Sequence, residues 1–228
     1  FGLRDSIVNV VDYQFEEVTT YDMSVYFANG QTPEEQADFI SDLGKKAENV
    51  MFYYQTSMDL EFNGKTREIY MIASGQRITE FIDLHKDDEK IPVPGVNEVV
   101  ISVGAAEGMG IRVGDTILMR NADLKTLELT VSGIYDNHVE NYTIIHPDTI
   151  SDQWGEPAQE HMAFVKVAEG QDAHVLAAEI TDFSDVMNVS VSEDFANMVG
   201  GMMDVKFTKE QLLDLNAKLN KIKAPKKK

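Results

Sequence analysis

The sequence contains no cysteine, which excludes disulfide bonds, thiolate metal ligands and cysteine nucleophiles. It also lacks any stretch of about 18 apolar residues, the length that a membrane-spanning helix requires. Basic residues are few, since 20 Lys and Arg face 39 Asp and Glu and leave a net charge of −19. Nucleic acids and anionic membrane surfaces would repel such a chain. These absences argue against a nucleic-acid-binding protein and against a protein that lies on a membrane through a basic face.

Catalytic motifs are missing as well. The chain has no G-x-S-x-G, S-x-x-K or P-loop pattern. The glycines in Gly108–Asp115 are spaced G-x-G-x-x-x-G and lead into a predicted strand, which is typical of a Gly-Asp turn and not of a nucleotide-binding loop. His138, Glu140 and His146 lie close together but lack a zinc-site spacing, so we interpret them as solvated loop residues. We therefore expect no catalytic residue, no metal and no cofactor.

The acidic charge stops abruptly near the C-terminal end. From Lys206 onward the sequence has eight Lys and two acidic residues, whereas residues 1–205 hold 12 Lys and Arg against 37 Asp and Glu. Residues 205–228 also carry a capping box and an apolar repeat typical of an amphipathic helix. This lysine-rich tail is either a helix for a partner or a membrane surface, or a vector-derived addition. The abrupt change of charge favours the second interpretation.

The first residues have the periodicity of a helix. An apolar stripe with spacings of four, four, four and three is formed by Leu3, Ile7, Val11, Phe15 and Val18. No capping residue precedes the stripe, so we expect the helix to extend upstream of the first residue given. Near the other end, Phe195, Met198 and Met202 are also helically spaced. Both segments are therefore predicted to be helices.

Between these helices the pattern predicts an α+β fold. A strand is expected at 21–27, followed by a helix that Thr32 and Glu35 begin with a capping box, and then by strands at 51–62 and 67–73. Several short strands at close spacing follow in the middle of the chain and indicate a small β-rich unit. A strand, a helix and a strand then complete the pattern. We predict a split βαβ layer with helices on one face and an inserted β-rich subdomain.

Three stretches of the sequence resemble parts of large MacB/FtsX-like ABC transporter permeases that lie in or lead into their extracytoplasmic domain. In the opening stretch FGLRDSIVNVVDYQFEEVTTYDMSV, the residues that match the family pattern are Gly2, Asp5, Ser6, Ile7, Gln14, Phe15, Tyr21 and Asp22. In the stretch that begins at Ile101, the matching residues are Ala106, Gly110, Gly114, Asp115, Ile117, Val131, Gly133 and Ile134. The stretch DFANMVGGMMD is similar to the family's approach to its next membrane helix. The tail departs from the family, which would continue into a hydrophobic helix.

The resemblance implies an organisation and a role. Its expected parts are a helix continuing from a membrane span at 1–20, a porter-like layer at 21–90 and 160–194, the β-rich insert at 91–159, the approach to the next membrane helix at 195–204, and the tail at 205–228. The domain would lie on the extracytoplasmic side of the cell membrane. A cytoplasmic ATPase subunit would hydrolyse ATP and drive motion through the membrane helices, so the domain itself would not be an enzyme. The residues expected to couple this motion are Leu3, Ile7, Val11, Phe15, Phe195, Met198 and Met202.

Two other functions remain open from the sequence. The first is a stand-alone secreted acidic binding module. The second is a carboxylate-based hydrolase, which predicts a deep pocket with raised carboxylate pKa values. The permease interpretation instead requires the first helix and the segment at 195–204 to be adjacent, on one side of the fold.

Overall fold

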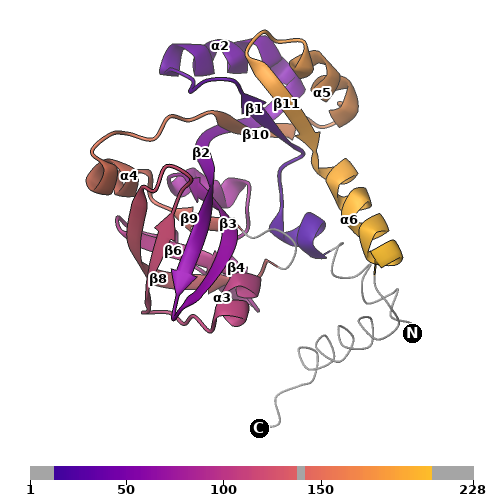
Figure 1. The fold of residues 1–228 in the computed structure, drawn as a ribbon. Helices are drawn as coiled ribbons and strands as arrows, with labels where there is room; N and C mark the ends of the chain where they lie inside the picture. Colours follow the sequence, from indigo (N-terminus) through magenta and orange to yellow (C-terminus); the bar gives the residue numbers. More distant parts are fainter. Residues whose placement is uncertain (1–12, 138–141, 207–228) are drawn as a thin grey trace.

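A computed structural model describes residues 13–137 and 142–206, and these residues form two units that share one nine-stranded sheet (Figure 1). The strand order is β11-β1-β10-β2-β3-β9-β6-β8-β7, with an additional pairing between β2 and β7. The first four strands in this order belong to an open α/β layer. The strands from β2 to β7 curve into a barrel, because the additional pairing joins the last strand to the first.

The α/β layer has the split βαβ arrangement that the sequence predicts. Its elements are β1 (Met23–Phe27), α2 (Pro33–Leu43), the first part of β2 (Ala47–Phe62), β10 (Met162–Val167), α5 (Ala173–Thr181) and β11 (Val186–Val191). The strands pair antiparallel in the order β11-β1-β10-β2, and α2 and α5 cover one face (Figure 1). Alternate side chains of β1, Met23, Val25 and Phe27, are buried against this helical face. The predicted α+β fold class is confirmed.

Helix α2 begins with the predicted capping box. The Thr32 hydroxyl accepts a hydrogen bond from the Glu35 N–H at 3.3 Å, and the Glu35 carboxylate accepts one from the Thr32 N–H at 2.8 Å. The Thr32 hydroxyl also donates to the Glu35 carboxylate at 2.9 Å, and the two hydrogen bonds that this carboxylate accepts, from the Thr32 backbone N–H and from its hydroxyl, lower the pKa of Glu35. Ala47–Phe62 is a single strand of 16 residues, longer than the predicted strand at 51–62.

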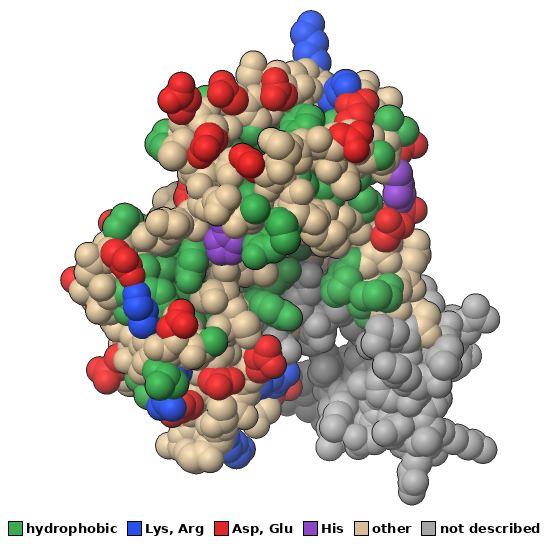
Figure 2. Space-filling model, turned by 45° about the horizontal axis from the view of Figure 1, so that its top comes forward, with side chains coloured by type: hydrophobic (Ala, Val, Ile, Leu, Met, Phe, Trp, Pro, Cys, Tyr) green, Lys and Arg blue, Asp and Glu red, His purple; other side chains and the backbone are tan. Residues whose placement is uncertain are grey.

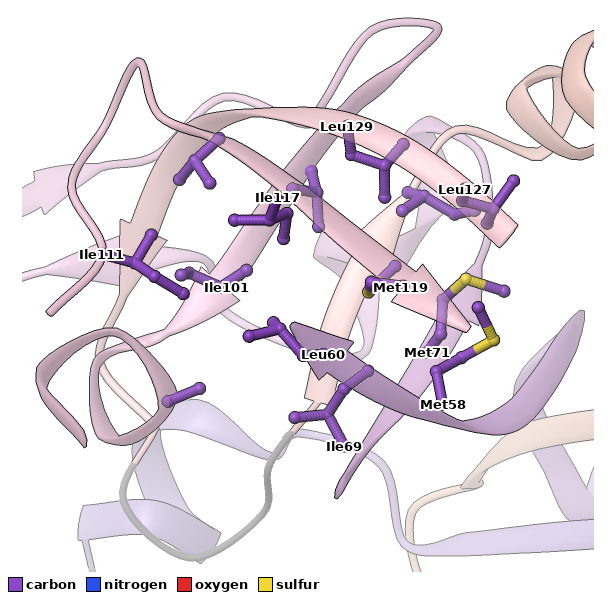
Figure 3. Packing of buried hydrophobic residues seen from close by; sticks show 14 of the residues in the cluster. Met58, Leu60, Ile69, Met71, Ile101, Ile111, Ile117, Met119, Leu127 and Leu129 are labelled. Carbon is purple, nitrogen blue, oxygen red and sulfur yellow. The ribbon is translucent and has the colours of Figure 1, made fainter. Parts of the chain in front are cut away.

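The β-rich unit is a barrel filled by apolar side chains. Its further strands are β3 (Lys65–Ala73), β6 (Glu98–Ser102), β7 (Thr116–Arg120), β8 (Thr126–Tyr135) and β9 (Tyr142–Ile145). The pairs β3–β9 and β6–β8 are parallel and the others are antiparallel. Figure 3 shows Leu60, Ile69, Ile117 and Met119 pointing into the space that the strands enclose. Closure of the barrel depends on pairing between residues far apart in the sequence.

Strand β2 belongs to both units. Its first half pairs with β10, and its second half pairs with β3 and β7. By strand pairing, β3 and the end of β2 therefore belong to the barrel. The resemblance had implied that residues 21–90 all belong to the layer. The boundaries at 91 and 159 stay predictions.

Two short helices in the barrel differ from the sequence expectation. Residues Val103–Met109 form α3 and residues Pro147–Trp154 form α4, where turns and strand ends were expected. The Ser102 hydroxyl accepts a hydrogen bond from the Ala105 N–H at 3.2 Å and so caps α3. Gly110 ends α3 in the left-handed conformation, so Gly108 lies in a helix. The predicted Gly-Asp turn is confirmed only at Gly114 and Asp115, just before β7.

Candidate coupling site

The two helices at the ends of the described chain lie side by side. Helix η1, a π-helix at Tyr13–Val18, leads into β1, and α6 (Ser192–Lys206) leaves β11. Strands β1 and β11 are hydrogen-bonded to each other, and η1 and α6 are in contact (Figure 1). The adjacency that the permease interpretation requires is therefore present.

The first turn of α6 is hydrogen-bonded to the two residues just before β1. The Ser192 N–H donates to the Asp22 carbonyl, and the Ser192 hydroxyl donates to the Tyr21 carbonyl, both at 2.8 Å. The Asp22 carboxylate in turn accepts from the Val167 N–H at the end of β10, at 2.7 Å. Three elements thus meet at two consecutive residues. A displacement of α6 would have to move β1 or break these hydrogen bonds.

The end of η1 is fixed by backbone hydrogen bonds to a segment far along the chain. The Thr19 N–H donates to the Gln14 carbonyl at 2.8 Å, which closes the wide turn of a π-helix. The Asp83 N–H donates to the Val18 carbonyl at 2.8 Å, and the Thr20 N–H donates to the Phe81 carbonyl at 2.9 Å. The end of η1 is therefore held against the segment that follows η3 (Gln76–Glu80).

A stack of aromatic rings lies beneath this attachment. Phe164 stacks on Tyr21 and on Tyr53, with ring centroids 4.0 and 4.2 Å apart, and Phe81 lies 6.0 Å away. The same apolar cluster includes Val18 from η1, and it reaches barrel residues from β3, β6, β8 and β9, namely Ile72, Val100, Tyr135 and Ile144. One continuous core therefore joins η1, the layer and the barrel.

The start of α6 also contacts α5 through a charged pair. His174 Nε2 lies 3.0 Å from Asp194 Oδ1 and Nδ1 lies 3.9 Å from Asp172 Oδ1. The hydrogen bond to Asp194 and its negative charge raise the pKa of His174, and Glu193 and Asp172 add smaller effects in the same direction. The pair is exposed to solvent, so it stabilises the contact only modestly.

Asp194→Asn is expected to lower the pKa of His174 toward its ordinary value of 6.5, because the charged partner is lost. Since the folded pKa is raised, the contact stabilises fully below the unfolded pKa and is lost as pH rises through the folded pKa. A histidine NMR titration measures this shift. Asp172→Asn is the matched control: an amide oxygen still caps α5 there, and the pKa is expected to fall less. Equal shifts in the two variants would contradict the dominant role of Asp194.

The seven predicted coupling residues are placed unevenly. Leu3, Ile7 and Val11 lie outside the described residues. The backbone of Phe15 forms part of η1, and the backbone of Met202 forms part of α6. The remaining two have described side chains: Phe195 is half-buried, whereas Met198 is 52% exposed. The structure brings η1 and α6 together, and the role of their residues stays a prediction.

The structure explains three residues that entered the sequence analysis only through the family pattern. Gln14 is fully buried, and its amide nitrogen donates to the Thr19 hydroxyl at 3.3 Å. Tyr21 stacks on Phe164, and Asp22 ties β1 to β10. Sequence reasoning missed Ser192, although a serine between a strand and an acidic helical segment is a signal for a helix start.

The described residues do not form a metal site or a membrane-spanning helix. Within residues 13–137 and 142–206, no group of three or more His, Asp or Glu side chains is arranged to hold a metal ion. His146 caps α4, because its Nδ1 accepts from the Asp148 N–H at 3.2 Å, while His138 and Glu140 lie outside the described residues. Among the described helices, none combines the length and the apolar character that crossing a membrane requires. The shifted carboxyl pKa values, those of Glu35, Glu80 and Glu156, are all lowered.

The chain belongs to the family of MacB-like periplasmic core domains, since the model of that family matches residues 1–183. It is therefore an extracytoplasmic domain of a MacB-like ABC transporter permease, and this confirms the resemblance seen in the sequence. No curated protein matches the chain.

Three solved structures are similar to the chain at low identity. The periplasmic region of MacB from Actinobacillus actinomycetemcomitans is 12% identical, with 83% of this chain and 97% of that chain covered and a TM-score of 0.48. The extracellular domain of the noncanonic ABC-type transporter YknZ from Gram-positive bacteria is 13% identical, with coverage of 72% and 100% and a TM-score of 0.45. A domain of a putative permease from Porphyromonas gingivalis is 15% identical, with coverage of 69% and 70% and a TM-score of 0.41.

Proposed function

We propose that this domain relays movement from membrane helices to the extracytoplasmic space, and that it performs no catalysis itself. In this proposal a cytoplasmic ATPase drives the membrane helices, η1 and α6 carry their displacement, and the layer and barrel move as one lever. MacB-like permeases work with a cytoplasmic ATPase, which supports the first step. The transported substrate and any surface partner are left open.

The observation that carries the proposal is the convergence of η1 and α6 on paired strands. Both helices reach the two residues just before β1, Tyr21 and Asp22, one through the chain and the other through the hydrogen bonds of Ser192. Opposed movements of the two helices would therefore be resisted, whereas a joint movement would displace the whole sheet. In such an arrangement the displacements of η1 and α6 produce a single movement of the layer.

Packing supports transmission beyond the layer. The core that contains Val18 and Phe164 continues into the barrel through Ile72 and Val100. Close-packed interiors deform little and pass strain to their neighbours. Strand β2, which belongs to both units, adds a covalent connection.

Replacing Leu3, Ile7 and Val11 together with Asn in the full-length permease is expected to uncouple ATP hydrolysis from movement of this domain. The apolar stripe of the first predicted helix would lose its first three members, while the described core would be untouched. Because the chain has no cysteine, a spin label at Leu124→Cys is unique within it, and Leu124 is 75% exposed. The measurement is the ATP-dependent change in distance from this label to a second one on a membrane helix.

The control variant is Asn9→Gln, which leaves the stripe intact. Folding of the isolated domain, followed by circular dichroism, is expected to be the same for the triple variant and the control. A full ATP-dependent distance change in the triple variant would show that the first helix does not transmit movement. A stand-alone binding module would show no ATP-dependent change in either protein.

A further inference from the structure

Strand β11 forms the open edge of the shared sheet. At the opposite end of the strand order, β7 closes onto β2, so the barrel side has no free edge. Within the described residues, β11 pairs with β1 alone (Figure 1). An edge of this kind is a template for an additional strand.

The backbone groups on the free side of β11 can be assigned from its pairing. The Ser192 N–H donates to the Asp22 carbonyl, so Ser192 faces β1. In an antiparallel pair, residues alternate between facing the partner strand and facing away from it. Ser190 therefore also faces β1, whereas Val189 and Val191 turn their N–H and C=O groups outward.

This edge lacks two of the residue types that often protect exposed strands. The strand sequence VMNVSV contains no lysine and no proline. The register shifts between Tyr26 and Phe27, which leaves Met187 as an extra residue near the start of β11. From Asn188 to Val191 the pairing is regular, and the side chain of Met187 is 64% exposed. A regular segment of free edge is thus available.

Acidic side chains flank both ends of the strand. Asp182 and Asp185 precede β11, Glu193 and Asp194 follow it, and all four are exposed. Figure 2 shows more acidic than basic side chains over the upper unit, which carries α2 and α5. Asp194 is already paired with His174, so the other three carboxylates remain available to a cation.

The same charges disfavour a second copy of this chain as the added strand. In an antiparallel pairing of two copies centred on Val189, Asp185 just before β11 of one copy would come near Glu193 in the first turn of α6 of the other, since each is four residues from the centre. Two negative charges brought close together repel each other. A strand with basic residues would instead be attracted to the carboxylates at both ends of β11.

We propose that the free edge of β11 binds an extended, lysine- or arginine-rich segment of a partner protein as an additional strand. Main-chain hydrogen bonds at Val189 and Val191 would provide affinity, and the flanking carboxylates would select a basic segment. The proposal does not depend on the coupling role of η1 and α6, because it concerns the side of β11 that faces away from β1.

The test uses a fluorescein-labelled peptide of eight alternating Lys and Val residues and measures anisotropy with the full chain. The unmodified peptide is expected to bind. The same peptide with alternate backbone amides N-methylated is expected to bind at least about tenfold more weakly, because one hydrogen-bonding edge is blocked. A general attraction of positive peptide to negative protein would leave the two peptides equal, and would overturn the proposal.

Variants of the protein test the location. Val189→Pro removes an outward N–H and is expected to weaken binding, while Asp185→Asn with Glu193→Gln is expected to weaken it and reduce its salt dependence. The matched control, Glu107→Gln with Asp148→Asn, removes the same charge from α3 and α4 and is expected to bind normally. Equal weakening in the control would place the peptide elsewhere. A dimer by sedimentation that Val189→Pro dissociates would make a second copy the occupant and overturn the proposal.

Discussion

Phe164→Ala is expected to lower the free energy of unfolding by about 3–5 kcal/mol, the usual cost of removing a buried aromatic ring. Phe164 is fully buried, and its ring lies between Tyr21 and Tyr53 at 4.0 and 4.2 Å. Its neighbours come from just before β1, from β2 and from the segment after η3. Those elements are hydrogen-bonded and cannot close the cavity without moving the attachment of η1.

Urea unfolding of the isolated domain, followed by circular dichroism, measures this loss. Tyr70→Ala is the matched control, because it also truncates an aromatic ring but at a side chain that is 47% exposed. Its expected effect is within about 1 kcal/mol. A Phe164→Ala effect as small as that of the control would mean that the ring stack does not hold η1, the layer and the barrel together.

The sequence predicted the layer well because its signals are local. The capping box at Thr32 and Glu35 and the alternation in Met23–Phe27 each depend on residues within one element. The repetition of strand and helix on both sides of the insert was sufficient to indicate a split βαβ arrangement. The family pattern added Gln14, Tyr21 and Asp22, whose hydrogen bonds and ring contacts the structure identifies.

The barrel was predicted less completely, for physical reasons that differ from element to element. Helix α3 is seven residues long and contains two glycines, so its propensity is low and its burial in the barrel core stabilises it. For α4 a signal was present: Pro147 occupies the first turn and Gly155 ends the helix. Closure through β2 and β7 joins residues about 60 positions apart, and no local pattern encodes such a pairing.

The coupling site, like the closure of the barrel, could be predicted only in part from the sequence. Its two helices were predicted from apolar spacing, and their adjacency follows only from the pairing of β1 with β11. The polar contacts that fix them, from Ser192 to Tyr21 and from Asp83 to Val18, link positions far apart in the sequence. Such contacts depend on the completed fold.

Gly133→Ala is expected to lower the free energy of unfolding by about 1–3 kcal/mol, the usual cost of overpacking a core. Gly133 lies in β8, where the register with β6 shifts between Val99 and Val100. A Cβ atom built there would lie 2.4 Å from Ile91 Cγ2 and 3.4 Å from Val100 Cγ2. Ile91 packs against the core that joins the layer to the barrel, so it cannot move away without losing that contact. This close approach gives a physical reason for a glycine at the position that matched the family pattern.

A double-mutant cycle with Ile91→Ala decides whether steric contact is the cause. Ile91→Ala alone is expected to destabilise through lost burial, but it opens the space that the new methyl group needs. Gly133→Ala is therefore expected to cost less in the Ile91→Ala background than in the original protein, which gives a non-zero interaction energy between the two positions. If the two losses in the free energy of unfolding were additive, the destabilisation by Gly133→Ala would come from the backbone of β8. In that case, the glycine would serve the irregular register with β6 and not the packing of Ile91.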